Sequence, residues 1–383
     1  MMYITRDQSL VKDIKSKMFS GKAILIQGAR QVGKTTLVQR LLSNFENGRI
    51  KKLNFDDPDN VDLIMGKGFR YLKGLFDEAD IIFLDEIQKL PEAGNTVKML
   101  VDNYKKTKQV IITGSSSIFL SNQIKESLTG RKYTYNLYPF SYRELSKEYG
   151  REYFPLNTET ILKYGLYPEV HSVTSFKEKE ELLDEITDSY LYKDILELQR
   201  IKNPLVLRKL LRALALQIGS EVSVNELARK VELSKNTVDS YIDLLEKSFV
   251  LFRLPAYSSN KRREISRNKK IYFYDVGIRN AVINDFRDMD LRNDVGHLWE
   301  NLIISERLKL LSYSKKKAGQ YFWRTFDGAE VDYVEESAGE VAGYEIKRNS
   351  NKTSRVPQKW ADGAGDSYMV VNDENYGQFL SKA

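Results

Sequence analysis

The sequence predicts an α/β fold for the N-terminal part of the chain, with a doubly wound parallel sheet. Short apolar segments recur along this part, and their composition is typical of strands buried on both faces of a sheet. Segments with apolar residues at helical spacing lie between them, and such alternation is typical of βαβ units. Glycine, acidic or hydroxyl side chains follow the apolar segments, at the edge where open α/β sheets bind ligands.

The predicted elements follow one another in order, beginning with an amphipathic helix over residues 8–19. The predicted strands cover residues 23–27, 52–55, 81–84, 109–113 and 132–137, and the predicted helices between them cover residues 36–42, 60–76 and 96–106.

The first strand is followed by the pattern G-x-x-x-x-G-K-T, which begins at Gly28. Its glycines allow a tight turn that points backbone N–H groups at a phosphate, and the next helix adds the positive end of its dipole. The Lys34 ammonium would reach the β- and γ-phosphates, and the Thr35 hydroxyl would ligate Mg²⁺. The turn residues expected to bind nucleotide are Gly28, Ala29, Arg30, Gln31, Val32, Gly33, Lys34, Thr35 and Thr36.

Two acids end the third predicted strand. Asp85 would hold Mg²⁺ through water, and Glu86 would polarise the attacking water as the catalytic base. The adjacent acid favours an ATPase over a GTPase or a small-molecule kinase, so ATP and Mg²⁺ are the expected cofactors.

Two further polar positions are candidates for contact with the γ-phosphate. Ser115 or Ser116 follows the fourth strand, where an ordinary serine-rich loop is the alternative. Arg131 precedes the fifth strand and would act as an arginine finger, from its own chain or a neighbour; a surface arginine is the alternative.

Composition limits the class of protein. The chain has 383 residues, 42% hydrophobic and 30% charged, which suits two or three soluble domains. It lacks cysteine and has only two histidines, so disulfides and zinc sites rich in thiolate or histidine are excluded. No apolar run approaches the ~20 residues needed to cross a bilayer, and the N-terminus lacks an apolar signal core. We expect a cytoplasmic protein without a membrane partner, whose net charge of +7 favours either an anionic partner or simple solubility.

The segments GARQVGKTT, IIFLDEIQKLP, ITGSSS and LTGRKYTYNLYPFSYREL together carry a resemblance. They resemble prokaryotic ATPases of the AAA superfamily in which a P-loop domain precedes a winged helix and a C-terminal nuclease-like domain. The last segment, with LYPFSYREL after the arginine, is the most particular to this group. The resemblance implies ATP binding and hydrolysis.

The middle of the chain predicts a helix-turn-helix. A short helix near residues 222–228, a turn and a second helix over residues 235–247 precede a wing strand near residues 249–254. The second helix would offer Lys235 and Asn236 to a DNA groove. The basic stretch suited to phosphates contains Lys261, Arg262, Arg263, Arg267, Lys269 and Lys270. A winged helix that packs only against protein is the alternative.

The C-terminal third predicts a nuclease-like frame. Glu300 lies on an expected helix, Asp332 on an expected strand, and Glu345 and Lys347 on the next strand as E-x-K. This order resembles the PD-(D/E)xK nuclease superfamily. Asp332 and Glu345 would bind Mg²⁺, and Lys347 would orient water and stabilise the charge on phosphorus, with Glu300 joining from the helix. An antiparallel sheet with solvated acids is the alternative.

We therefore expect a P-loop ATPase domain over residues 1–150, a helical and winged-helix module over residues 151–265, and a restriction-endonuclease-like α/β domain over residues 266–383. The expected function is Mg²⁺-dependent ATP hydrolysis coupled to DNA binding. An ATP-regulated nuclease and a nucleotide-switched protein scaffold are the alternatives, and a homo-oligomer remains open.

Overall fold

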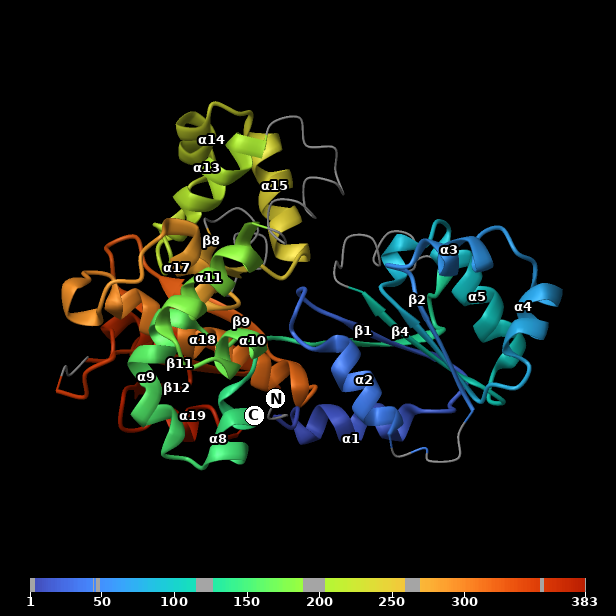
Figure 1. The fold of residues 1–383 in the computed structure, drawn as a ribbon. Coiled ribbons are helices and arrows are strands. Elements are labelled where there is room, and N and C mark those ends of the chain that lie inside the picture. The colour runs from blue at the N-terminus through green and yellow to red at the C-terminus, as the bar shows by residue number, and fades with distance from the viewer. Residues whose placement is uncertain are drawn as a thin grey trace. The chain divides into compact units, whose positions relative to one another are not determined.

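The computed structural model describes residues 4–43, 45, 49–114, 127–188, 204–258, 269–351 and 355–382. The chain forms two compact units (Figure 1). The N-terminal unit comprises residues 5–138 and 247–249, and the C-terminal unit comprises residues 1–4, 139–246 and 250–383.

The N-terminal unit contains one sheet with helices on both faces. Its strands are β1 (Ala23–Gln27), β2 (Ile50–Asn54), β3 (Ile81–Asp85), β4 (Gln109–Gly114) and β5 (Lys132–Asn136). Its helices are α1 (Gln8–Lys17), α2 (Lys34–Leu42), α3 (Pro58–Ile64), α4 (Phe69–Phe76), the 3₁₀ turn η1 (Ile87–Lys89) and α5 (Ala93–Tyr104).

The five strands are arranged in the order β2-β3-β4-β1-β5, and every neighbouring pair is parallel. Apolar residues of α3, α4 and α5 form one buried core with the sheet, and α1 and α2 lie on the other face (Figure 1). The predicted α/β fold with a parallel sheet is confirmed.

One predicted helix was wrong in its extent. The expected helix over residues 60–76 is interrupted between α3 and α4, where Gly66 has a φ of 70°. This left-handed conformation suits glycine and ends a right-handed helix.

The C-terminal unit contains two sheets surrounded by helices. Its strands are β6 (Glu221–Val222), β7 (Leu251–Pro255), β8 (Lys269–Phe273), β9 (Gly319–Arg324), β10 (Glu330–Ser337), β11 (Glu340–Ile346) and β12 (Ser367–Val371). Its helices are α8 (Tyr142–Tyr149), α9 (Tyr153–Tyr164), α10 (Pro168–Ser172), α11 (Phe176–Ile186), α13 (Pro204–Ala215), α14 (Val224–Val231), α15 (Lys235–Lys247), α17 (Val276–Ile283), η4 (Met289–Leu291), α18 (Val295–Tyr313), η5 (Trp360–Ala364) and α19 (Tyr376–Phe379).

The smaller sheet has the order β6-β8-β7 and is antiparallel, and α14 and α15 precede its strand β7. The larger sheet has the order β12-β11-β10-β9; β9, β10 and β11 are antiparallel, whereas β12 runs parallel to β11. A bridge between Ala256, just after β7, and Phe322 on β9 connects the two sheets. Residues of β8 therefore lie close to the larger sheet.

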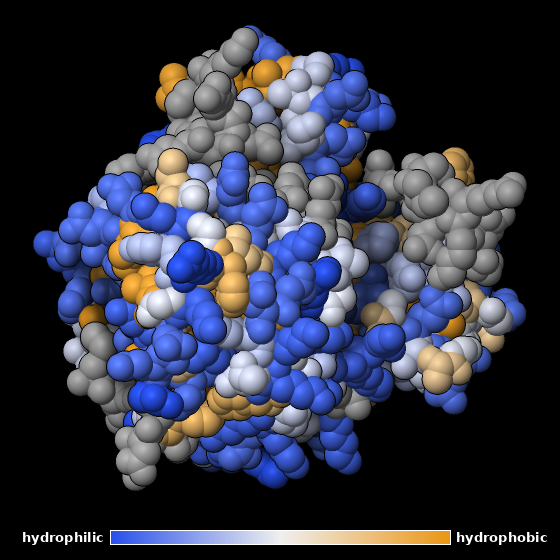
Figure 2. All heavy atoms as spheres, turned by 90° about the vertical axis from the view of Figure 1, so that its right-hand side faces the viewer, coloured by the Kyte–Doolittle hydropathy of each residue, from blue (hydrophilic) through white to orange (hydrophobic). Residues whose placement is uncertain are grey.

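The surface is polar over most of one face. On the face drawn in Figure 2, hydrophilic side chains cover most of the described residues, and apolar side chains form small groups between them. Among the described residues, no helix is long and apolar enough to cross a membrane.

Candidate functional site

The carboxyl ends of the parallel strands meet at one edge of the N-terminal sheet. The register pairs Gln27 at the end of β1 with Gly114 on β4 and Asn136 on β5. Asp85 ends β3 and is paired with Asn54 on β2. The phosphate-binding loop after β1 and the two acids at the end of β3 are therefore brought together, as predicted for an open α/β sheet.

Lys34 is the first residue of α2, and its side chain folds back over the loop before it. Its Nζ donates to the carbonyl oxygens of Ala29 at 2.8 Å and Gly28 at 3.3 Å, and the residue is buried. The loop turns through positive φ at Gln31 and Gly33 (60° and 89°). The loop's own carbonyl groups thus hold the ammonium in place.

Thr35 and Asp85 form the second part of this site. Thr35 Oγ1 donates to the Asp85 carboxylate and lies 3.0 Å from each of its oxygens. Thr113 on β4 donates to the same carboxylate, and Lys52 Nζ on β2 lies 3.7 Å from it. Neither Thr113 nor Lys52 was predicted from the sequence, although Thr113 is the one hydroxyl residue in the apolar run QVIIT.

Glu86 follows directly with a left-handed backbone, at a φ of 53°. Its N–H donates to Thr113 Oγ1 at 3.3 Å, and the Gln88 side-chain amide donates to its carboxylate. Thr113 therefore contacts both predicted acids, the side chain of Asp85 and the backbone of Glu86.

The residues at this edge fit Mg²⁺. The Thr35 hydroxyl and the Asp85 carboxylate are the hard oxygen ligands that Mg²⁺ prefers, and water and nucleotide phosphates commonly complete its shell. When bound, Mg²⁺ would neutralise charge on the β- and γ-phosphates.

Arg131 lies at the opposite edge of the sheet. Its carbonyl oxygen accepts from the N–H of Ala23, the first residue of β1, at 2.9 Å. Its guanidinium donates to Asp102 on α5 at 2.5 Å. The structure does not bring Arg131 to the phosphate-binding loop of its own chain, and contact with a nucleotide on a neighbouring chain stays a prediction. Ser115 and Ser116 lie outside the described residues.

The four predicted nuclease residues converge in the C-terminal unit. Glu300 lies on α18, Asp332 on β10 and Glu345 on β11. Lys347 Nζ lies 2.6 Å from Glu345 Oε1 and 3.7 Å from Asp332 Oδ2. The N–H of Ile346 donates to Asp332 Oδ2 at 2.8 Å, so the backbone of β11 also contacts this cluster.

Lys270 lies inside the same cluster. Its Nζ is 3.4 Å from Glu300 Oε1 and 3.9 Å from Asp332 Oδ1, and it also pairs with Glu330. Its side chain is only 2% exposed, so the prediction that Lys270 faces phosphates was wrong. Alternation along β8 turns Lys270 and Tyr272 to the same side, towards α18 and β10.

The charges of the cluster shift one another's pKa values. Burial lowers the pKa of Lys270, but the carboxylates of Glu300, Asp332 and Glu330 outweigh burial and raise it above its usual value. Burial raises the pKa of Glu300, but the adjacent Lys270 ammonium leaves it below its usual value. Burial, with Glu300 and Glu345 nearby, raises the pKa of Asp332 to about 7.

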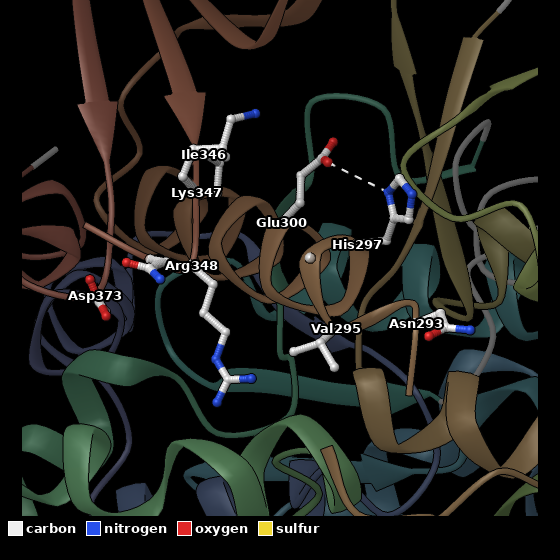
Figure 3. A pocket seen from close by; sticks show the side chains of 10 residues that line it. Asn293, Val295, His297, Glu300, Ile346, Lys347, Arg348 and Asp373 are labelled. Atoms are coloured by element: carbon white, nitrogen blue, oxygen red, sulfur yellow. Dashed lines mark ion pairs between the residues drawn. The ribbon is translucent and has the colours of Figure 1, made fainter. Parts of the chain in front are cut away.

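A pocket of about 580 Å³ opens beside the cluster, between the start of α18 and the chain after β11. Figure 3 shows the Glu300 carboxylate pointing towards His297, whose Nδ1 lies 3.9 Å away. The adjacent Glu300 carboxylate raises the pKa of His297 above its usual value. Figure 3 shows the Arg348 side chain pointing away from Lys347. The Arg348 guanidinium pairs with Glu159 on α9 at 3.3 Å. The positively charged side chains that line the pocket, Lys347 and Arg348, therefore point in different directions and do not face one common ligand position.

Ammonium groups face both carboxylates of the predicted Mg²⁺ site, Asp332 and Glu345. Within the described ranges, no group of three or more histidine, aspartate and glutamate side chains could hold a metal ion. Lys347 faces Glu345, and both Lys270 and Lys347 face Asp332. With ammonium groups this close to both carboxylates, the residues in this arrangement do not fit a divalent cation.

The predicted DNA residues of α15 are accessible. Lys235 and Asn236 are exposed on its first turn. Near its end, Glu246 accepts from Arg253 Nε on β7 at 2.8 Å, which fixes the helix to the smaller sheet. The basic residues Lys261, Arg262 and Arg263 lie outside the described residues.

The strand order, the phosphate-binding loop and the acids after β3 define a P-loop ATPase domain of the AAA type. Residues 20–146 match the family described as an AAA domain. Residues 157–288 and 295–378 match two families described as domains of unknown function, DUF8612 and DUF4143. The AAA part of the predicted resemblance is thereby confirmed.

The chain is similar over most of its length to proteins described as uncharacterized. Rv2008c of Mycobacterium tuberculosis is 26% identical over 340 residues, which cover 88% of this chain and 73% of that protein. An uncharacterized protein of Haemophilus influenzae is 25% identical over 368 residues, 92% of this chain and 86% of that protein. Among solved structures, the Walker-type ATPase PABY2304 of Pyrococcus abyssi covers 73% of this chain and 96% of its own, with 16% identity and a TM-score of 0.49.

Proposed function

We propose that this protein is a Mg²⁺-dependent ATPase that couples its nucleotide state to DNA binding by the C-terminal unit. The observation that carries the ATPase part is the convergence of Lys34, Thr35 and Asp85 at the phosphate-binding loop. The Lys34 ammonium and the loop N–H groups bind the phosphates, and Asp85 and Thr35 hold Mg²⁺. Glu86 orients the attacking water.

The segment after β5 supports coupling between the two units. The N–H of Leu137 donates to the carbonyl oxygen of Gln27 at 2.7 Å. A Cβ atom on Gly28 would lie 2.0 Å from the carbonyl oxygen of Leu137. The chain that leaves β5 therefore packs directly against the first glycine of the phosphate-binding loop.

A few residues further on, the same segment is fixed within the C-terminal unit. Lys309 Nζ on α18 donates to the carbonyl oxygen of Phe140 at 3.0 Å, and the N–H of Tyr142 donates to Glu306 at 2.5 Å. Lys309 and Glu306 are 2.6 Å apart, and both side chains are only 1% exposed. A shift of the loop on nucleotide binding would thus reach α18 through a short, anchored stretch of chain.

The smaller sheet and its helices support the DNA part of the proposal. Helices α14 and α15 followed by β7 have the order of a winged helix, with α15 as its recognition helix. Lys235 and Asn236 are exposed on the first turn of α15, where recognition helices contact base edges. The basic residues that follow β7 in the sequence, Lys270 excepted, would bind phosphates regardless of the DNA sequence.

The test measures ATP turnover with and without duplex DNA, and duplex binding across a salt titration. Replacing Arg262, Arg263 and Lys269 by Gln should weaken binding to all duplexes and flatten the salt dependence by about 0.9 in log–log slope per lost phosphate contact. The matched control replaces three exposed lysines elsewhere in this unit, Lys315, Lys316 and Lys317. An unchanged slope in the first variant would place the DNA contact elsewhere.

A second candidate function is an ATP-regulated nuclease. The convergence of Glu300, Asp332, Glu345 and Lys347 favours it, whereas the ammonium groups among the carboxylates disfavour a metal-dependent form. DNA cleavage that is lost in Lys347→Ala, with ATP turnover retained, would support it. A protein that is captured in a nucleotide-dependent way, without any DNA binding, would instead support a scaffold.

A further inference from the structure

We propose that Lys270 is the resident cation of the carboxylate cluster in the C-terminal unit, so that this unit neither requires nor binds a divalent metal there. The inference concerns a different site from the ATPase site and does not depend on it. It also means that the cluster differs from a metal-dependent nuclease site, which the sequence pattern suggests, in its cation.

The position of Lys270 carries the proposal. Three carboxylates from two elements surround its Nζ: Glu300 of α18, and Glu330 and Asp332 of β10. The ammonium is almost completely buried, so its charge is balanced by these groups rather than by water. A divalent cation shared by Glu300 and Asp332 would have to occupy the same space.

Other donors also contact the carboxylates of the cluster. Tyr272 donates its hydroxyl to Glu300 Oε1 at 2.5 Å. Asp332 Oδ2 accepts from the backbone N–H of Ile346 at 2.8 Å and faces Lys347 at 3.7 Å. Lys347 lies 2.6 Å from Glu345. A metal would have to displace these donors as well as an ammonium, which makes its binding unfavourable.

Lys270 connects the two sheets of the C-terminal unit. Lys270 belongs to β8, the central strand of the smaller sheet, whereas its partners lie on α18 and β10. Tyr272 on the same strand reaches the same carboxylate of Glu300. The ion cluster therefore joins the two sheets without a metal, as a permanent part of the fold.

The test uses Mn²⁺ as the probe, with the full chain and without nucleotide. All variants carry Asp85→Asn, which removes the carboxylate of the ATP site. Electron paramagnetic resonance of free Mn²⁺ measures binding, and thermal unfolding measures stabilisation. The parent protein, which carries Asp85→Asn alone, should bind no Mn²⁺, and Mn²⁺ should not shift its melting temperature. Lys270→Met keeps the length of the side chain but frees three carboxylates, so it should melt lower, bind Mn²⁺ stoichiometrically and regain stability with it.

Lys309→Met is the matched control, because Lys309 is equally buried but pairs with the single carboxylate of Glu306. It should lose stability without gaining Mn²⁺ binding. If Lys270→Met does not fold, the double variant Lys270→Met with Glu330→Gln leaves less unbalanced charge and takes its place. Mn²⁺ bound by the parent protein and lost in Asp332→Asn would overturn the proposal, as would a folded Lys270→Met that binds none.

Discussion

Gly28→Ala tests whether the segment after β5 packs against the phosphate-binding loop. A Cβ atom at position 28 would lie 2.0 Å from the carbonyl oxygen of Leu137 and 3.3 Å from Val32 Cγ2. Real Cβ atoms essentially never approach another atom within 3.0 Å, so loop and segment must separate by about 1 Å. Overpacking of this kind costs about 1–3 kcal/mol.

The assay is ATP titration together with thermal unfolding. To bind phosphate, the loop of the variant must move back against Leu137, which restores the strain of about 1–3 kcal/mol. This cost lowers ATP affinity by about 5- to 150-fold. The control is Gly74→Ala, because Gly74 is exposed within α4 and a Cβ atom there meets nothing within 4 Å. Alanine at that helical position should leave ATP affinity unchanged and raise stability by up to about 1 kcal/mol.

Two outcomes would refute the reasoning about Gly28. If Gly28→Ala keeps both the ATP affinity and the melting temperature of the parent protein, the contact with Leu137 does not constrain the loop. If Gly74→Ala loses ATP affinity to the same degree, the effect is a general loss of stability in the N-terminal unit.

Four further predictions concern single residues. Lys34→Ala should lose most ATP affinity, measured by nucleotide titration, because the phosphates lose their buried ammonium; unchanged affinity would contradict the assignment. Glu86→Gln should keep ATP binding but lower turnover by about 100-fold or more, since its carboxylate orients water. Arg131→Ala should hydrolyse ATP normally as an isolated chain, and loss of turnover that is restored by mixing with Glu86→Gln would show a finger supplied by a neighbour. Burial and the nearby Lys179 lower the pKa of His171 to about 4, so between pH 6.5 and 4 the unfolded chain binds a proton that the folded chain does not. Stability should therefore fall as pH drops through this window, and melting curves of His171→Phe should lack that loss.

The N-terminal unit could be predicted well because its signals are local. The G-x-x-x-x-G-K-T pattern, the apolar runs and the acids after β3 each depend on a few adjacent residues. The position of Arg131 depends instead on how two strands far apart in the sequence pair with each other. Because β5 runs parallel to β1, a residue that precedes β5 lies at the amino edge of the sheet, away from the loop after β1.

The cluster in the C-terminal unit shows the same limit. The E-x-K spacing correctly placed Glu345 and Lys347 near Asp332, because alternation along one strand fixes their side. Lys270 could not be placed in this way. The residue before it, Lys269, is also a lysine, and only the pairing of β8 with β6 and β7 determines which of the two turns inward. The KKIYFY run does contain a signal, since a lysine that alternates with apolar residues on a buried strand needs a carboxylate partner.

The segment LYPFSYREL, the most particular part of the resemblance, has an explanation that does not involve chemistry at the nucleotide. Ser141 and Glu144 form a capping box that starts α8 directly after the chain enters the C-terminal unit. Glu306 accepts the N–H of Tyr142, and Lys309 holds the carbonyl oxygen of Phe140. A buried ion pair that binds backbone groups fixes the path of the chain regardless of the side chains it carries. Since Leu137 packs against Gly28 at the other end, the segment connects the phosphate-binding loop to the contacts with α18 within a few residues, as the proposed coupling requires.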